Sequence, residues 1–282
     1  MRPLDDYIKN QLNEHLKEIE KALGADGLTI LSPILPGLDR TVRDVVEDIP
    51  TKKNALVIML DTPGGVVEVV ERMVETIRHF YREVFFIIPD RAMSAGTIFA
   101  LSGDRILMDY FSCLGPIDPQ IEKDGVLVPA LSYLNQFERL NKKAENGVLT
   151  SAEYALLSKL DLGELYQFEQ ARELSVELLI KWLSNYKFKN WIQTETRKLP
   201  VTQKRKEKQA KKIATELNKN DRWHSHGRGI DMKTLTEELK IKIEDYNTIP
   251  KLGKTVREYF ELLRDYMIRA NMTSFTHTTR FF

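Results

Sequence analysis

Two short segments of the chain carry the residue types of a serine nucleophile and of an oxyanion site. The first is Asp61-Thr62-Pro63-Gly64-Gly65, and the second, Met93-Ser94-Ala95-Gly96-Thr97, places Ser94 29 residues after Gly65. A serine on a tight turn near a helix start can act as a nucleophile. Exposed glycine N–H groups can stabilise the oxyanion that forms. The pair indicates acyl-transfer chemistry, and the alternative reading of Ser94 is a small residue at a crowded turn.

The general base has several candidates, because a serine hydroxyl needs a neighbouring group that takes its proton. Lys142 and Lys143 lie on a predicted helix, and Lys123 is closer to Ser94 in sequence. His226 lies in the polar loop 224–229, and an imidazole suits proton transfer near neutral pH. His224 and His226 have no third partner for a metal, so we expect no metal site. Asp118 could orient a base, but the sequence favours a role in capping the loop between two prolines.

The elements that position these residues follow from the apolar pattern. Leu56–Leu60 and Phe85–Ile88 are short continuous apolar runs, typical of strands buried on both faces. Residues 66–81 between them have the stripe of an amphipathic helix. The alternation of strand and helix predicts a wound α/β core, with Gly64 and Gly65 at the end of one strand.

Four ordered motifs carry a family resemblance: LDTPGG (60–65), AMSAGT (92–97), GDRILMD (103–109) and LGPIDPQI (114–121). They resemble the serine dehydrogenase proteinase family, relatives of signal peptide peptidase A within the Clp protease/crotonase superfamily. The resemblance resumes at His226-Gly227-Arg228-Gly229-Ile230. It implies an α/β fold, a Clp/crotonase-like spiral of strand-strand-helix units, with additional helices in the C-terminal half.

The resemblance also implies a serine endopeptidase that forms an acyl-enzyme. Ser94 would be the nucleophile, the N–H groups of Gly65 and Ala95 would hold the oxyanion, and Gly64 would shape the turn. The Clp protease histidine, expected about 25 residues after the serine, is absent from residues 115–120. Because the relatives mostly use serine–lysine pairs, the base is predicted as Lys143, Lys142 or His226, with a slight preference for lysine.

Composition excludes few classes. The 282 residues carry a net charge of +1 and a single cysteine, so no disulfide framework is expected. No apolar run approaches the length of a membrane span and the N-terminus lacks the apolar core of a signal peptide, so we expect no integral membrane segment and a cytoplasmic location. No cofactor is implied. The basic stretch 197–219 is read as a solvated helix face, and no nucleic acid partner is expected.

The domain organisation is predicted as an N-terminal helix (1–25), a protease domain (26–250) with a helical, basic insertion at about 150–219, and a C-terminal helix and tail (251–282). Amphipathic helices at 5–23 and 251–270 offer apolar stripes, and members of the superfamily form rings or stacked trimers, so a homo-oligomer acting on peptides or unfolded proteins is expected. Two alternatives stay open: crotonase-type acyl-thioester chemistry, and a non-catalytic scaffold that has lost its base.

Overall fold

The protein has a parallel-rich sheet at its centre, in a computed structural model that describes residues 3–123, 126–194 and 198–282. In this described part, six strands lie in the order β10-β5-β3-β2-β1-β11, and only β11 runs antiparallel to its neighbour. The strands are β1 (Asp26–Leu31), β2 (Ala55–Asp61), β3 (Glu83–Ile87), β5 (Arg105–Met108), β10 (Glu244–Asp245) and β11 (Phe275–His277). The predicted α/β core is confirmed.

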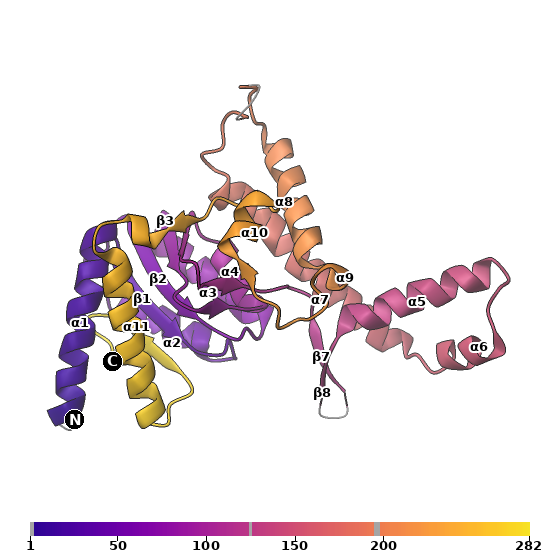
Figure 1. Cartoon of the computed structure of the whole chain (residues 1–282), viewed down its shortest axis with the longest axis horizontal. Helices are drawn as coiled ribbons and strands as arrows, with labels where there is room; N and C mark the ends of the chain where they lie inside the picture. The colour runs from indigo at the N-terminus through magenta and orange to yellow at the C-terminus, as the bar shows by residue number, and fades with distance from the viewer. Residues whose placement is uncertain (1–2, 124–125, 195–197) are drawn as a thin grey trace.

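Both faces of the sheet are covered by helices, which explains the continuous apolar strands. Ile58 and Leu60 of β2 pack into one core, and Val57 and Met59 pack into the other. The first core includes residues of α2 (Leu38–Glu47), α3 (Val67–Phe80) and α4 (Ala95–Leu101). The second includes residues of α1 (Pro3–Leu23) and α11 (Leu252–Arg269), which lie side by side in Figure 1. The helices predicted at 5–23 and 251–270 are confirmed, and the predicted domain boundaries at 25 and 250 stay a prediction.

A second, small sheet lies next to the segments that contain Ser94, Asp118 and His226. It joins β4 (Arg91–Ala92), β6 (Cys113–Leu114) and β9 (Ile230–Asp231), with β6 in the middle. β4 runs parallel to β6, and β9 runs antiparallel to it. Ser94 therefore lies just beyond the carboxyl end of β4, at the start of α4.

The rest of the chain forms a helical part beside the sheet. An extension leaves the body of the molecule at the hairpin of β7 (Gln120–Lys123) and β8 (Val126–Pro129) and continues into α5 (Ala130–Glu145) and α6 (Ser151–Leu157) (Figure 1). The remaining elements are α7 (Leu162–Trp182), a π-helical turn (Leu183–Lys187), α8 (Gln203–Leu217), α9 (Asn220–Trp223), α10 (Met232–Glu237) and a 3₁₀ turn (Tyr246–Thr248). Among the described helices, none has both the length and the apolar character that a membrane crossing requires.

The C-terminal tail, which the sequence pattern left unassigned, joins the central sheet. His277 of β11 pairs with Thr29 of β1 in register and is fully buried. Its Nδ1 lies 2.7 Å from the Tyr259 hydroxyl, and its Nε2 lies 3.1 Å from Oδ1 of Asn13. The Tyr259 hydroxyl also donates to Oγ1 of Thr29 at 2.8 Å. This buried polar network ties the tail to α1, α11 and β1.

Acidification is expected to destabilise the protein through His277. Burial lowers the pKa of His277 from 6.5 to about 4. Between these two pH values His277 is therefore protonated in the unfolded chain and neutral in the folded protein. The contribution of neutral His277 to the free energy of unfolding is complete above pH 6.5. It is lost as the pH falls from 6.5 toward 4, and the loss is on the order of 3 kcal/mol. Denaturant unfolding of the natural protein and of His277→Gln across this window measures the difference. Equal losses in the two proteins would contradict the expectation.

Candidate active site

Ser94 has a backbone conformation that a residue with a side chain rarely adopts. Its φ is 52° and its ψ is −118°, and its side chain makes no capping bond to α4. The turn is fixed on both sides, because Met93 N–H donates to the Thr62 carbonyl at 3.0 Å and Thr97 N–H donates to the Ser94 carbonyl at 2.9 Å. Such local strain persists only where surrounding structure holds it, and it clusters at functional sites.

Gly64 and Gly65 form the turn against which Ser94 packs. Their φ values are 101° and 147°, a region that favours glycine. A Cβ on Gly64 would lie 2.8 Å from Cβ of Ser94, and one on Gly65 would lie 2.1 Å from the Ile34 carbonyl oxygen. Side chains are therefore excluded at both positions, and the Gly64 backbone lies directly beside the serine.

Two backbone N–H groups near Ser94 remain available as donors. Gly64 N–H is already used, since it donates to Oγ1 of the buried Thr62 at 3.1 Å. Gly65 N–H and Ala95 N–H, by contrast, have no acceptor within the described part of the chain. Unused donors on either side of a nucleophile are what an oxyanion site requires. Gly64 N–H is therefore occupied, whereas the N–H groups of Gly65 and Ala95 are unused among the described residues.

His226 and Asp118 form a side-chain pair at the end of the small sheet. Nδ1 of His226 lies 2.9 Å from Oδ1 of Asp118. The Asp118 side chain is 1% exposed and that of His226 is 23% exposed. A carboxylate at this distance accepts the Nδ1–H, which leaves the Nε2 lone pair free to accept a proton. From the sequence, a capping role was preferred for Asp118 and orientation of a base was the alternative; this contact is of the kind that the alternative requires.

The strand register explains why these two residues meet. Leu114 of β6 pairs with Ile230 of β9, and Asp118 follows Leu114 by four residues while His226 precedes Ile230 by four. Ala92 of β4 also pairs with Leu114, in parallel. Ser94, Asp118 and His226 consequently all lie beyond the same end of the three-stranded sheet.

The candidate lysines lie in the extension. Nζ of Lys143 forms an ion pair with Oε1 of Glu153 at 2.5 Å, and this contact helps to lower the pKa of Glu153 to about 2. Lys142 is exposed on the same helix, α5, which points away from the central sheet in Figure 1. Lys123 lies in β7, whose side chains are outside the described part. The structure does not bring Lys142 or Lys143 to Ser94 within this chain by any contact among described residues.

Asp61 adds a titratable group at the start of the glycine turn. It ends β2, and its Oδ1 accepts the Arg91 N–H at a long 3.4 Å. Burial, and then the neighbouring Asp90 carboxylate, raise the pKa of Asp61 to about 6. Mild acid therefore removes a negative charge three residues before Gly64. Asp61 was not among the site residues predicted from the sequence, although it stands inside the LDTPGG motif.

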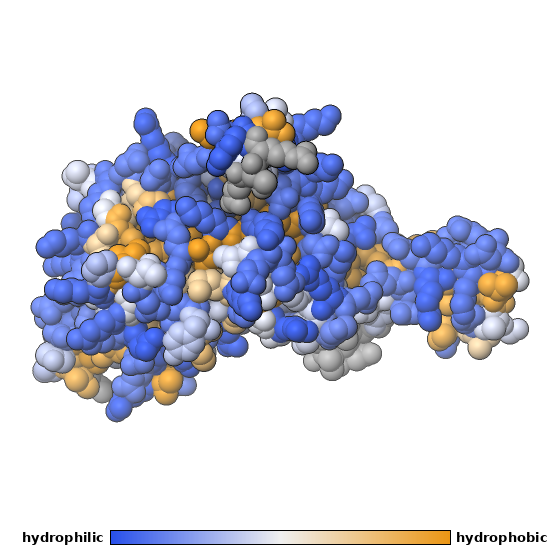
Figure 2. Space-filling model, turned by 45° about the horizontal axis from the view of Figure 1, so that its top comes forward, coloured by the Kyte–Doolittle hydropathy of each residue, from blue (hydrophilic) through white to orange (hydrophobic). Residues whose placement is uncertain are grey.

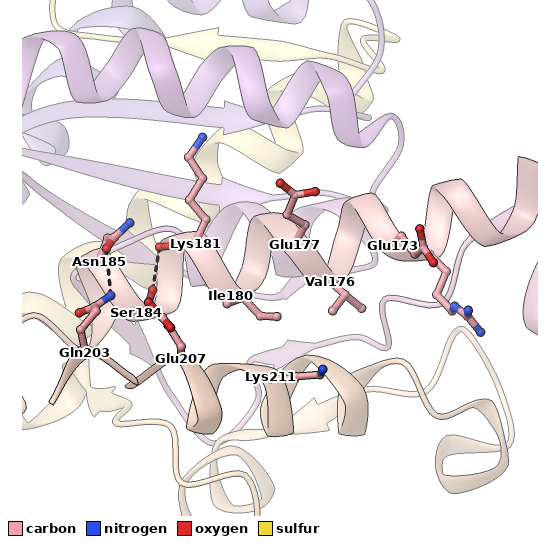
Figure 3. Close-up of a pocket in the computed structure, with 11 residues that line it drawn as sticks. Glu173, Val176, Glu177, Ile180, Lys181, Ser184, Asn185, Gln203, Glu207 and Lys211 are labelled. Atoms are coloured by element: carbon pink, nitrogen blue, oxygen red, sulfur yellow. Dashed lines mark hydrogen bonds between the residues drawn. The ribbon is translucent and has the colours of Figure 1, made fainter. Parts of the chain in front are cut away.

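A groove of the described surface lies away from these residues. It has a volume of about 650 Å³ and lies between α7 and α8, and its lining includes Val176 and Ile180, which point toward α8, and Lys211 of α8 (Figure 3). Asn185 and Gln203 close one end with a hydrogen bond of 3.4 Å. Ser94, Asp118 and His226 do not line it, so we do not place the chemistry there.

Comparison with known proteins identifies similar chains. A family model described as ClpP-like SDH-type serine proteinase matches residues 37–159. Two uncharacterised proteins of Methanocaldococcus jannaschii are 29% identical over 156 residues and 31% identical over 157 residues, in each case over 52% of this chain. The chain spans about half the length of these curated relatives, 50% and 52% respectively. Among solved structures, a variant of the 1510-N membrane-bound stomatin-specific protease is 20% identical, with a TM-score of 0.31, over 42% of this chain and 60% of its own.

Proposed function

We propose that the protein is a serine endopeptidase, because residues 37–159 match the model of the ClpP-like SDH-type serine proteinase family and the turn at Ser94 has the geometry expected of a nucleophile. The family places the α/β core in the predicted Clp/crotonase-like fold. Peptides or unfolded proteins are the proposed substrates. The observation that supports the proposal most is that the His226–Asp118 pair and the strained Ser94 lie beyond the same end of the three-stranded sheet.

The proposed mechanism gives each residue one task. Ser94 Oγ attacks the peptide carbonyl while Nε2 of His226 takes the hydroxyl proton. Asp118 accepts the Nδ1–H of His226, holds the ring in this tautomer and stabilises the imidazolium. The N–H groups of Gly65 and Ala95 donate to the oxyanion of the tetrahedral intermediate. His226 then protonates the leaving amine. In the second half of the reaction Nε2 of His226 takes a proton from a water molecule that attacks the acyl carbon, and it returns this proton to Ser94 Oγ as the carboxylic acid product leaves.

We propose His226 as the base rather than Lys142 or Lys143. A lysine base must be neutral, which requires burial away from negative charge. Lys143 is instead paired with Glu153, and Lys142 is exposed. Nδ1 of His226 contacts the buried Asp118, and no hydrogen bond to Nε2 is found among the described residues. This proposal therefore reverses the preference for a lysine base that was drawn from the sequence.

Acyl-thioester chemistry is the alternative reaction, because it uses the same oxyanion geometry without a serine nucleophile. Peptide hydrolysis and acyl-thioester chemistry are distinguished by incubating the protein with an unfolded protein such as reduced, alkylated casein, and in parallel with an acyl-CoA. New peptide fragments without thioester cleavage support the peptidase. Thioester cleavage that persists in Ser94→Ala, without fragments from casein, would contradict it, and inactivity on both substrates would favour the non-catalytic scaffold.

Self-association is a further part of the proposal, supported by the apolar surface of the extension. Figure 2 shows hydrophobic residues at its far end, away from the body of the molecule. Large apolar side chains exposed by more than half on and around α6 and α7 are Val148, Tyr154, Leu156, Leu162 and Tyr166. Such a surface marks an interaction site. Light scattering is expected to report a multiple of the 32.7 kDa chain, and a monomer across micromolar concentrations would contradict it. A cytoplasmic location stays a prediction.

A further inference from the structure

Thr97 is a fully buried polar residue beside the proposed site that the mechanism does not use. It lies in the first turn of α4, three residues after Ser94, and is 0% exposed. Its hydroxyl donates to the Ala92 carbonyl at 2.7 Å and accepts the Gly115 N–H at 2.8 Å. The Gly115 carbonyl lies 3.0 Å from the same oxygen. One hydroxyl thus contacts both segments that lead to the proposed catalytic residues.

The backbone ladder that joins these two segments is short. β4 and β6 are two residues long, and their ladder ends at the pair Ala92–Leu114. Ser94 follows β4 by two residues, and Asp118 follows β6 by four. The Thr97 hydroxyl links the two segments at Ala92 and Gly115, where the backbone ladder ends. This link therefore continues the contact between the segments beyond the ladder, toward Ser94 in one segment and toward Asp118 in the other.

The approach of the two segments is close enough to depend on side-chain size. A Cβ on Gly115 would lie 2.6 Å from Cε of Met93, the residue before Ser94. Gly115 can therefore bring its backbone against the serine turn, within reach of the Thr97 hydroxyl. A buried hydroxyl that satisfies a carbonyl and an N–H from different segments fixes their separation, because either group left unpaired in the interior is costly.

We propose that Thr97 is a positioning residue that sets the distance between the Ser94 turn and the Asp118 segment, and through Asp118 the place of His226. This inference rests on the proposed peptidase function and adds to it a residue that does not touch the substrate. Misplacement of reacting groups by about 1 Å can reduce a rate by about 10²-fold. Loss of the hydroxyl should therefore act on the chemical step and leave substrate binding largely unchanged.

The test compares Thr97→Val, which keeps the shape and removes the hydroxyl, with Thr97→Ser, which restores the hydroxyl. We expect Thr97→Val to lower kcat by about 10²-fold with KM within about twofold, and Thr97→Ser to stay within about threefold of the natural protein. Thr29→Val is the matched control, since Thr29 is also fully buried, with its hydroxyl bonded to Tyr259, but lies in β1 away from the site. It should lose stability without losing kcat.

All rates are normalised to active sites titrated with a fluorophosphonate and measured well below each melting temperature. If Thr97→Val does not fold, Thr97→Ala replaces it in the same comparison. An unchanged kcat in the variant without the hydroxyl, or an equal loss in Thr97→Ser, would overturn the positioning role. Inactivity of the natural protein would instead contradict the peptidase function itself, so the two failures are distinguishable.

Discussion

Replacement of Ser94 by alanine is expected to lower peptide hydrolysis by at least about 10³-fold while the fold is retained. The variant removes one oxygen that makes no capping bond in the folded protein, so the melting temperature should change little. The loss is large because removing a nucleophile leaves only the oxyanion donors and substrate binding to accelerate the reaction. Turnover of an unfolded protein substrate, measured beside a thermal melt, checks both halves of the expectation.

Ser94→Gly is the sharper companion variant, because it also removes the backbone strain. Glycine adopts a positive φ without the steric cost that Ser94 bears at 52°. We expect this variant to be as inactive as Ser94→Ala but more stable than it, by about 1 kcal/mol. Undiminished hydrolysis in either variant would show that Ser94 is not the nucleophile. A glycine variant less stable than the alanine variant would show that the turn is not strained.

His226→Ala is expected to produce the second large loss, about 10³-fold or more in kcat, because no other described group takes the serine proton in the proposed mechanism. Asp118→Asn should lower kcat by about 10²–10⁴-fold, since an amide stabilises the wrong tautomer of His226. In a double variant the two losses should not add, because the residues act as one unit.

The lysines supply the matched controls for this experiment. Lys142→Ala and Lys143→Ala should keep nearly full activity in the same assay, and Lys143→Ala should cost stability only through its half-buried pair with Glu153. A collapse of activity in either lysine variant, with full activity in His226→Ala, would identify a lysine base and refute the histidine. Full activity in all three would place the proton acceptor outside this list.

Much of the core could be predicted because its signals are local. The apolar runs of β2 and β3 and the stripe of α3 are each contained in a short window, and the Gly64–Gly65 turn follows directly from them. Ser94 could be singled out for the same reason, since its small neighbours and the following apolar residues are adjacent in sequence. The positive φ that the structure finds there was not predictable, because serine rarely adopts it.

The contacts across the chain could not be predicted in the same way. His226 and Asp118 are 108 residues apart, and they meet only because β6 and β9 pair in one register. Strands of two residues are too short for their pairing to be recognised in the sequence. β11 likewise has three residues, too short for an alternating pattern to be recognised, and its partner β1 lies at the other end of the chain. The role proposed for Thr97 could not be predicted, because one of the two residues that its hydroxyl bonds, Gly115, lies 18 residues later in the sequence.

The central claim, that Ser94 is a nucleophile activated within this site, is tested most directly by covalent labelling. The folded protein is treated with a fluorophosphonate probe, digested, and analysed by mass spectrometry, with His226→Ala and heat-unfolded protein treated in parallel. We predict a single stoichiometric adduct on Ser94, formed much more slowly in His226→Ala and absent after unfolding. No adduct on Ser94 in the folded protein, or labelling at the same rate after unfolding, would contradict the claim.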